Sequence, residues 1–154
     1  MNPKFQKLVN EVERLHGELM GMTPVTRENL GACNYPGVYL FTERGNDLYV
    51  GRTKRPLKTR LMEHARSSVM AAPFAFRLAR EATGNLKASY KSGDKSRDGL
   101  MRNPKFAAAF REQSERIGKM SIRYVRVDDA TTQALLEIYT ATVLGTPQNE
   151  FKTT

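Results

Sequence analysis

The sequence predicts an α+β fold: a small antiparallel three-stranded sheet flanked by helices, with an N-terminal helix and a helical insert. Two short runs of β-branched and aromatic residues, 37–42 and 47–51, are separated by the turn residues ERGN, which is typical of a β-hairpin. A later run, KMSIRYVRVDD, alternates apolar side chains with arginines and predicts a third strand. Amphipathic stretches lie before, between and after these runs, so helices are expected to cover the sheet.

The helices before the insert are read from apolar spacing and from proline. Residues 1–22 repeat apolar side chains at helical spacing between Lys and Glu, which predicts an amphipathic N-terminal helix. Pro56 suits the first turn of a second helix, and Leu57, Leu61 and Ala65 follow it at fourfold spacing. These three side chains are expected to line one helix face.

Residues 66–119 are expected to form the helical insert. Two helical stretches, PFAFRLAREA and NPKFAAAFREQSERI, are joined there by the polar loop GNLKASYKSGDKSRDG. After the third strand, Asp128 or Asp129 can cap a last helix, TTQALLEIYTATVLG, which Gly145 ends.

Length and charge point to one basic domain. The 154 residues suffice for a single core, so we expect one domain over 1–154. Lys and Arg number 25 against 16 Asp and Glu, a net charge of +9. Such a domain suits a polyanion, whose phosphates it neutralises.

The composition excludes several other classes of protein. Cys33 is the one cysteine, so an intrachain disulfide is excluded, and with only two histidines a structural zinc site is not expected. The chain has no apolar run of the roughly 20 residues that a membrane span requires. Its N-terminus lacks the apolar core of a signal peptide, and we expect a soluble, cytoplasmic protein.

Two tyrosines mark the hairpin as chemically unusual. If the loop comprises the three residues 43–45, Tyr39 pairs with Tyr49 and the phenols lie side by side. Two such hydroxyls can hold a water or act as general acid or base. An ordinary tyrosine pKa of about 10 then requires nearby positive charge to lower it.

Basic residues follow the second tyrosine at once. They stand against the single acid Glu63 and comprise Arg52, Lys54, Arg55, Lys58, Arg60 and Arg66. Arg60 and His64 are four residues apart, hence on one helix face, where the guanidinium can grip a phosphate. The alternative is a solvated basic helix start.

Glu137 is the remaining candidate. It lies in an otherwise uncharged helix, and its neighbours Gln133, Ala134, Thr140 and Ala141 are small or polar and are expected to leave room around the carboxylate. One carboxylate with open space suits Mg²⁺. An ordinary exposed glutamate on an amphipathic helix is the alternative.

In their order along the chain, these residues resemble the motifs of the GIY-YIG nuclease superfamily. The resemblance covers about residues 35–151, and Val38 and Val50 stand where the name-giving isoleucines would be. Its motifs are GVY at 37–39, YVG at 49–51, Arg60, His64, Glu137 and Asn149.

The resemblance implies a metal-dependent DNA endonuclease with a defined role for each residue. Tyr39 and Tyr49 organise or deprotonate the attacking water, with proton abstraction assigned to Tyr39 and His64 as its partner. Arg60 steadies the phosphate, and Glu137 holds Mg²⁺ or Mn²⁺. Asn149 supports the site from the tail, and Gly51 is required because a side chain would crowd the site beside Tyr49. The expected substrate contacts are Gly51, Arg52, Lys54, Arg55, Lys58 and Asn149.

Substrate and partners stay open. RNA is an alternative to DNA, and a second copy or a partner protein is expected to supply sequence specificity. The basic loop Lys87–Arg102 is a candidate for extra DNA contact. The alternative function is a non-catalytic nucleic-acid-binding module of the same fold, and a weaker one is a domain that binds acidic proteins.

Overall fold

The computed structural model describes residues 1–64, 72–85 and 96–151. The chain divides into two compact units, Met1–Arg60 with Met120–Thr154, and Leu61–Lys119. The first unit holds the sheet, and the second corresponds closely to the expected helical insert 66–119. Ala65, Arg66 and much of the basic loop Lys87–Arg102 lie outside the described residues.

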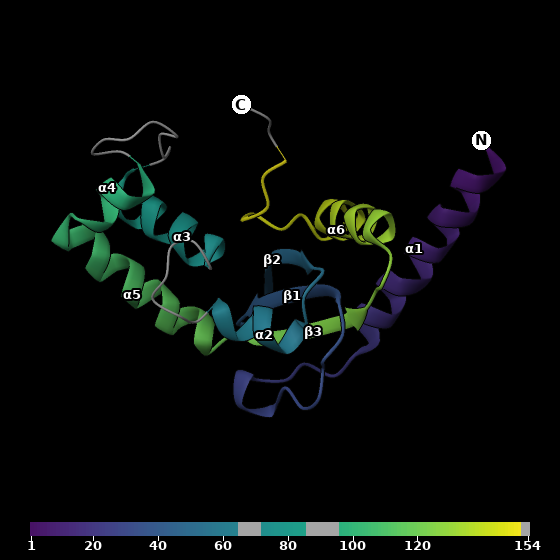
Figure 1. Cartoon of the computed structure of the whole chain (residues 1–154), viewed down its shortest axis with the longest axis horizontal. Helices are drawn as coiled ribbons and strands as arrows, with labels where there is room; N and C mark the ends of the chain where they lie inside the picture. Colours follow the sequence, from purple (N-terminus) through teal and green to yellow (C-terminus); the bar gives the residue numbers. More distant parts are fainter. Residues whose placement is uncertain (65–71, 86–95, 152–154) are drawn as a thin grey trace. The chain divides into compact units, whose positions relative to one another are not determined.

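The sheet has three antiparallel strands, as expected. They are β1 (Gly37–Glu43), β2 (Asn46–Thr53) and β3 (Ser121–Arg126), in the spatial order β2-β1-β3 (Figure 1). The central strand β1 is buried along almost its whole length. Gly37 begins it where a Cβ would overlap the Val125 carbonyl, so this position accepts only glycine without a shift of β3.

Four helical segments belong wholly or partly to the first unit. They are α1 (Pro3–Gly21), the short 3₁₀ helix η1 (Arg27–Asn29), α2 (Leu57–Glu63), which continues into the second unit, and α6 (Ala130–Leu144). Asn2 caps α1, and Asp129 caps α6 by accepting from the Thr132 N–H at 2.8 Å. Gly145 ends α6 in the left-handed region, with φ 63°.

One face of the sheet carries the core of this unit. Val38 and Leu40 of β1 point to this face, and α1 and α6 cover it. The buried residues of this core are Val12, Leu15, Leu19, Val38, Leu40, Val50, Val125, Val127, Leu136 and Ala141. Tyr39 and Phe41 alternate with Val38 and Leu40, so they occupy the opposite face.

The hairpin turn differs from the expected three-residue loop. Arg44 and Gly45 both have positive φ, 51° and 80°, and β2 begins directly at Asn46. This two-residue turn matches the right-handed twist of the strands. The pairing then shifts between Phe41 and Thr42, so a bulge changes the register along the rest of the hairpin.

The second unit is helical. Its elements are α3 (Pro73–Thr83), α4 (Arg97–Met101) and α5 (Pro104–Gly118), with α3 and α4 both packing on α5. The helix α4 lies where a loop was expected, and Ser96 caps it by accepting from the Gly99 N–H at 3.0 Å. A cluster of aromatic rings, Phe74, Phe76, Phe106 and Phe110, is buried in this unit.

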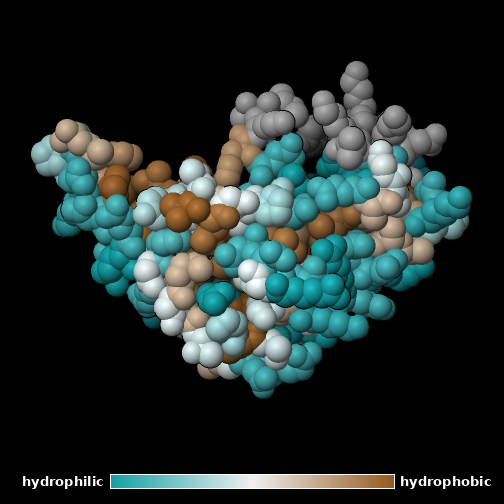
Figure 2. Space-filling view, turned by 180° about the vertical axis from the view of Figure 1, so that it is seen from behind, coloured by the Kyte–Doolittle hydropathy of each residue, from teal (hydrophilic) through white to brown (hydrophobic). Residues whose placement is uncertain are grey.

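The surface is mostly hydrophilic on the side that Figure 2 presents, with scattered hydrophobic areas. Exposed apolar side chains include Met1 and Phe5 on the N-terminal segment and Ile138 and Val143 on α6. In the described part of the chain, no helix has the length and apolarity that crossing a membrane requires.

Candidate active site

Tyr39 lies at the centre of the candidate site, in the middle of β1. Its side chain is 1% exposed and packs edge-on against Phe41, with ring centroids 5.7 Å apart. Gly51 lies opposite Tyr39 on β2, and a Cβ there would overlap the phenol Cζ and hydroxyl oxygen. A glycine at 51 therefore makes room for the phenol of Tyr39, whereas the expectation was that it clears space beside Tyr49.

The partner of Tyr49 on β1 is two residues away from the predicted one. Tyr49 faces Phe41 across the hairpin, so the expected direct pairing of the two tyrosines is wrong, because the turn is shorter and a bulge follows it. The two phenols are diagonal neighbours, with ring centroids 6.5 Å apart. Tyr49 is half-buried, so it is the more accessible of the pair.

Arg60 brings positive charge to Tyr39 from α2. The first turn of α2 is held by the Leu57 N–H, which donates to the Tyr35 carbonyl at 2.9 Å. Pro56 precedes the helix, and its carbonyl accepts from the Arg60 N–H at 3.1 Å. From this fixed turn the Arg60 guanidinium acts on the Tyr39 phenol by a hydrogen bond and by its charge.

The pKa of Tyr39 is raised well above its ordinary value. Burial is the main cause, and the nearby Tyr49 and Glu137 raise it further, while Arg60 opposes them. Arg60 lowers this pKa, as was expected of a nearby positive charge, but loss of water outweighs the guanidinium and the net shift is upward. Tyr39 is a neutral phenol near pH 7. Tyr49, Arg60 and Glu137, which shift this pKa, are all among the site residues expected from the sequence.

Glu137 lies in the middle of α6, with its side chain 19% exposed. Its Oε2 is 3.2 Å from Nε of Arg52, whose side chain is 43% exposed. Arg52 pairs with Val38 across the hairpin and so points to the face that α6 covers. Burial raises the pKa of Glu137, and the Arg52 charge and hydrogen bond partly offset this.

The surroundings of Glu137 are less open than expected. Gln133, one turn earlier, is fully buried and donates from Nε2 to the carbonyls of Thr53 and Val127, at 3.0 and 2.6 Å. Thr140 is also buried, and its hydroxyl lies 2.9 Å from Nδ1 of His16. These two neighbours fix α6 in place. Sequence reasoning missed the role of Gln133, although a polar residue four positions before Glu137 in an apolar helix was the available signal.

Asn149 binds the backbone of β2, the strand that carries Tyr49. Its Oδ1 accepts from the Val50 N–H at 2.8 Å, and its Nδ2 donates to the Val50 carbonyl at 2.7 Å. The Thr146 hydroxyl donates to the same Oδ1 at 2.7 Å, and the Gln148 N–H donates to the Leu48 carbonyl at 3.0 Å. Support from the tail is what was expected of Asn149. Its direct contact with substrate stays a prediction.

The basic side chains after β2 face solvent. Lys54, Arg55 and Lys58 are exposed, and the Arg55 N–H donates to the Thr53 hydroxyl at 3.0 Å, which shapes the turn into α2. Their expected role in substrate binding stays a prediction. Their exposure leaves them accessible to a polyanion.

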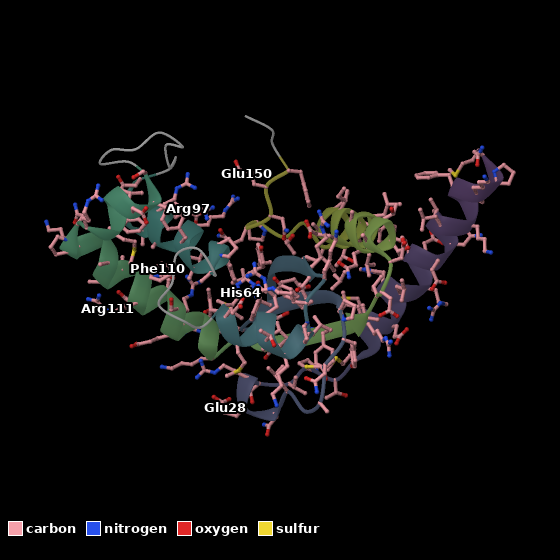
Figure 3. All side chains as sticks on the ribbon, in the orientation of Figure 1. Glu28, His64, Arg97, Phe110, Arg111 and Glu150 are labelled. Carbon is pink, nitrogen blue, oxygen red and sulfur yellow. The ribbon has the colours of Figure 1, made fainter. Side chains whose placement is uncertain are left out.

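His64 belongs to the second unit and directly follows α2 (Figure 3). Its imidazole is fully buried and packs edge-on against Phe74, with ring centroids 6.5 Å apart. The expected pairing with Arg60 and Tyr39 joins residues of different units and stays a prediction.

The donor chemistry fits a single divalent cation at Glu137. Among residues 1–64, 72–85 and 96–151 there is no group of three or more His, Cys, Asp or Glu side chains that could hold a metal. Mg²⁺ commonly binds through one or two carboxylates, keeps several waters and takes the rest of its ligands from substrate phosphate. A partly exposed carboxylate suits that mode, provided that its arginine partner leaves it when the cation binds.

Comparison with protein-family models, with curated proteins and with solved structures yields no match to this chain.

Proposed function

We propose that this chain is a Mg²⁺- or Mn²⁺-dependent endonuclease of the GIY-YIG type, which hydrolyses phosphodiester bonds in DNA. The supporting observation is the environment of Tyr39, a buried phenol whose ring lies 6.5 Å from that of Tyr49 and whose pKa is shifted by Tyr49, Arg60 and Glu137. These residues come from the hairpin, α2 and α6, and the motif order along the chain supports the same reading. Sequence specificity from a second copy or a partner protein stays part of the proposal.

The two tyrosines have different tasks in this proposal. Tyr49 is half-buried and can contact the attacking water. Tyr39 is a buried neutral phenol, which orients its surroundings by hydrogen bonding and does not act as a ready-made base. This changes the original assignment of proton abstraction to Tyr39.

Arg60 and Glu137 supply the electrostatics. The guanidinium of Arg60 can bind a phosphate oxygen of the scissile group, and removal of one such donor commonly costs on the order of a hundredfold in rate. The Glu137 carboxylate would hold the cation, with Arg52 moving to the incoming phosphate. When bound, Mg²⁺ or Mn²⁺ stabilises negative charge on the phosphate oxygens.

One observation favours the alternative of a non-catalytic nucleic-acid-binding module. The Arg52–Glu137 ion pair at 3.2 Å occupies the carboxylate that would hold the metal. If Arg52 keeps this contact in the presence of DNA, the basic surface binds the backbone and no cation enters.

A plasmid assay separates the two functions. Supercoiled plasmid is incubated with the protein and Mg²⁺ or Mn²⁺, beside an EDTA control and two variants, Glu137→Gln and Glu13→Gln. Glu13 is exposed on α1 and gives the same change of charge away from the site. Nicking that needs metal and Glu137 but is unaffected by Glu13→Gln supports the nuclease. Salt-sensitive retention of the plasmid without cleavage would support the binding module.

A further inference from the structure

The ion pair between Arg52 and Glu137 joins a side chain that is open to solvent with one that is largely buried. Nε of Arg52 lies 3.2 Å from Oε2 of Glu137, and the two side chains are 43% and 19% exposed. Among residues 1–64, 72–85 and 96–151, neither forms an ion pair with any other residue. Partly exposed ion pairs contribute little stability, so Arg52 can turn outward into water at a small cost.

The backbone around this ion pair is fixed without the help of Arg52. Gln133 lies one turn before Glu137 on α6 and is fully buried. Its Nε2 donates to the Thr53 carbonyl at 3.0 Å and to the Val127 carbonyl at 2.6 Å. Thr53 directly follows Arg52, so a buried side chain joins α6 to the end of β2 beside the ion pair. The ion pair can therefore open by a side-chain movement alone, while Glu137 keeps its place.

A divalent cation and the Arg52 guanidinium compete for the same carboxylate. With both bound, the single negative charge of Glu137 would face the unit charge of the guanidinium and the double charge of the cation. Two such cations about 5 Å apart repel each other enough to weaken cation binding by about tenfold, even where solvent screens most of the interaction. The ion pair therefore keeps the affinity of Glu137 for Mg²⁺ low in the protein without substrate.

A phosphate group removes this competition. Its oxygens accept charge-assisted hydrogen bonds from a guanidinium, and they are also preferred ligands of Mg²⁺. A phosphate that binds Arg52 would free the Glu137 carboxylate and add negative charge between the two cations. Lys54 and Arg55 follow Arg52 along the chain and are exposed, so they attract a polyanion to this point.

We propose that the Arg52–Glu137 ion pair is a latch: Arg52 keeps the carboxylate of Glu137 from binding the cation until a backbone phosphate of DNA binds the guanidinium. The choice of cation and of DNA rests on the proposed function. Cation and DNA then bind cooperatively, because each of them favours the state in which the ion pair is open. The latch would make cation binding at Glu137 depend on the presence of substrate.

The first measurement is a Mg²⁺ titration of the protein alone at constant ionic strength. The backbone amide signals of α6 in two-dimensional NMR spectra give the Mg²⁺ affinity of wild type and of the variants Arg52→Gln, Glu137→Gln and Arg126→Gln. Arg126 is the matched control, because it also forms an exposed ion pair, with Asp128 at 3.1 Å. Its neighbour Val125 points to the face that α6 covers, so Arg126 lies on the other face of the sheet.

Arg52→Gln should bind Mg²⁺ about tenfold more tightly than wild type, because the competing charge is removed. Arg126→Gln should bind Mg²⁺ like wild type, and Glu137→Gln should show no saturable shift near residue 137. Equal affinities of wild type and Arg52→Gln would overturn the proposal. An equal gain in Arg126→Gln, or saturable shifts that persist in Glu137→Gln, would overturn it as well. Circular dichroism checks that each variant is folded.

The second measurement tests the part played by the phosphate. Fluorescence anisotropy gives the affinity for a short labelled duplex with and without Mg²⁺, at constant ionic strength and over times in which a denaturing gel shows the duplex intact. Coupling between two ligands is reciprocal, so the factor by which Mg²⁺ raises duplex affinity is the factor by which the duplex raises Mg²⁺ affinity. This factor should be about tenfold larger in wild type than in Arg52→Gln. The same factor in both proteins would refute the release of Arg52 by phosphate.

The plasmid assay distinguishes failure of the latch from failure of the proposed function. If wild type nicks plasmid with metal and Glu137 while Arg52→Gln gains no Mg²⁺ affinity, only the latch is refuted. If Arg52→Gln gains Mg²⁺ affinity as expected but wild type does not cleave, the latch stands and the nuclease proposal fails.

Discussion

Gly51→Ala tests whether the position of the Tyr39 ring matters for cleavage. The new methyl group would overlap Cζ and the hydroxyl oxygen of Tyr39 and would lie 2.6 Å from its Cε2. Ordinary carbon contacts are about 3.5 Å or longer, so the ring must move by roughly 1 Å. A misplacement of about 1 Å at an active site can cost on the order of a hundredfold in rate.

The same change should also lower stability. Adding a methyl group to a packed interior typically costs about 1–3 kcal/mol, and the ring is enclosed by Phe41 and β2. Gly17→Ala is the matched control, because a Cβ at Gly17 in α1 meets nothing within 4 Å. That variant should be more stable by about 1 kcal/mol, since alanine is the better helix former.

The assay combines initial rates of plasmid nicking with urea unfolding of each variant. Gly51→Ala should cleave about a hundredfold more slowly under conditions where it is still folded. Gly17→Ala should cleave like wild type. A Gly51→Ala protein that nicks plasmid at the wild-type rate would refute the claim that the Tyr39 phenol is part of the site.

Three further predictions concern Glu137, Arg52 and Asn149. Because burial raises the pKa of Glu137, the folded state holds its proton more tightly, and stability should fall as pH rises through the interval above the ordinary value. The urea unfolding midpoint of wild type should fall across this pH interval, and that fall should be absent in Glu137→Gln. The same pH profile in both proteins would contradict the prediction. Arg52→Gln removes the charge that lowers this pKa, so the acid limb of the cleavage pH profile should move to higher pH; a shift to lower pH would be inconsistent with the ion pair. Asn149→Asp replaces the donor to the Val50 carbonyl with an oxygen, so the free energy of unfolding in urea should fall by about 1–3 kcal/mol. An unchanged free energy of unfolding would show that the contacts of Asn149 with Val50 do not stabilise the fold.

The strands and the longer helices could be predicted because their signals are local. The β-branched and aromatic runs on either side of turn residues identified β1 and β2, and alternation of apolar side chains identified β3. Asp129 was one of two candidate caps of the last helix, and it is the one that caps α6. The polar series Tyr39, Tyr49, Arg60 and Glu137 was also recognisable by residue type.

The register of the hairpin could not be predicted in the same way. Arg44 adopts a positive φ that non-glycine residues rarely take, so the turn read as one residue longer than it is. The bulge beyond Phe41 then depends on how the strands pack and leaves no local signal. As a result, Tyr39 pairs with Gly51, a contact that neither GVY at 37–39 nor YVG at 49–51 predicts alone.

Contacts between residues far apart in the sequence could not be predicted either. The ion pair between Arg52 and Glu137 joins residues 85 positions apart, and the shift of the Tyr39 pKa depends on burial more than on the nearby arginine. The short helix α4 was missed because its segment, RDGLM, has little more than one turn and contains a glycine.

The clamp between Asn149 and Val50 has a consequence for self-association. β2 is an outer strand of the sheet, and such a strand with unpaired N–H and C=O groups is a template for another chain. The side-chain amide mimics a neighbouring peptide group and closes that edge at Val50. The tail segment therefore blocks the pairing of another strand with β2. Truncation before Asn149 would leave the N–H and C=O of Val50, next to Tyr49, available to a strand of another chain.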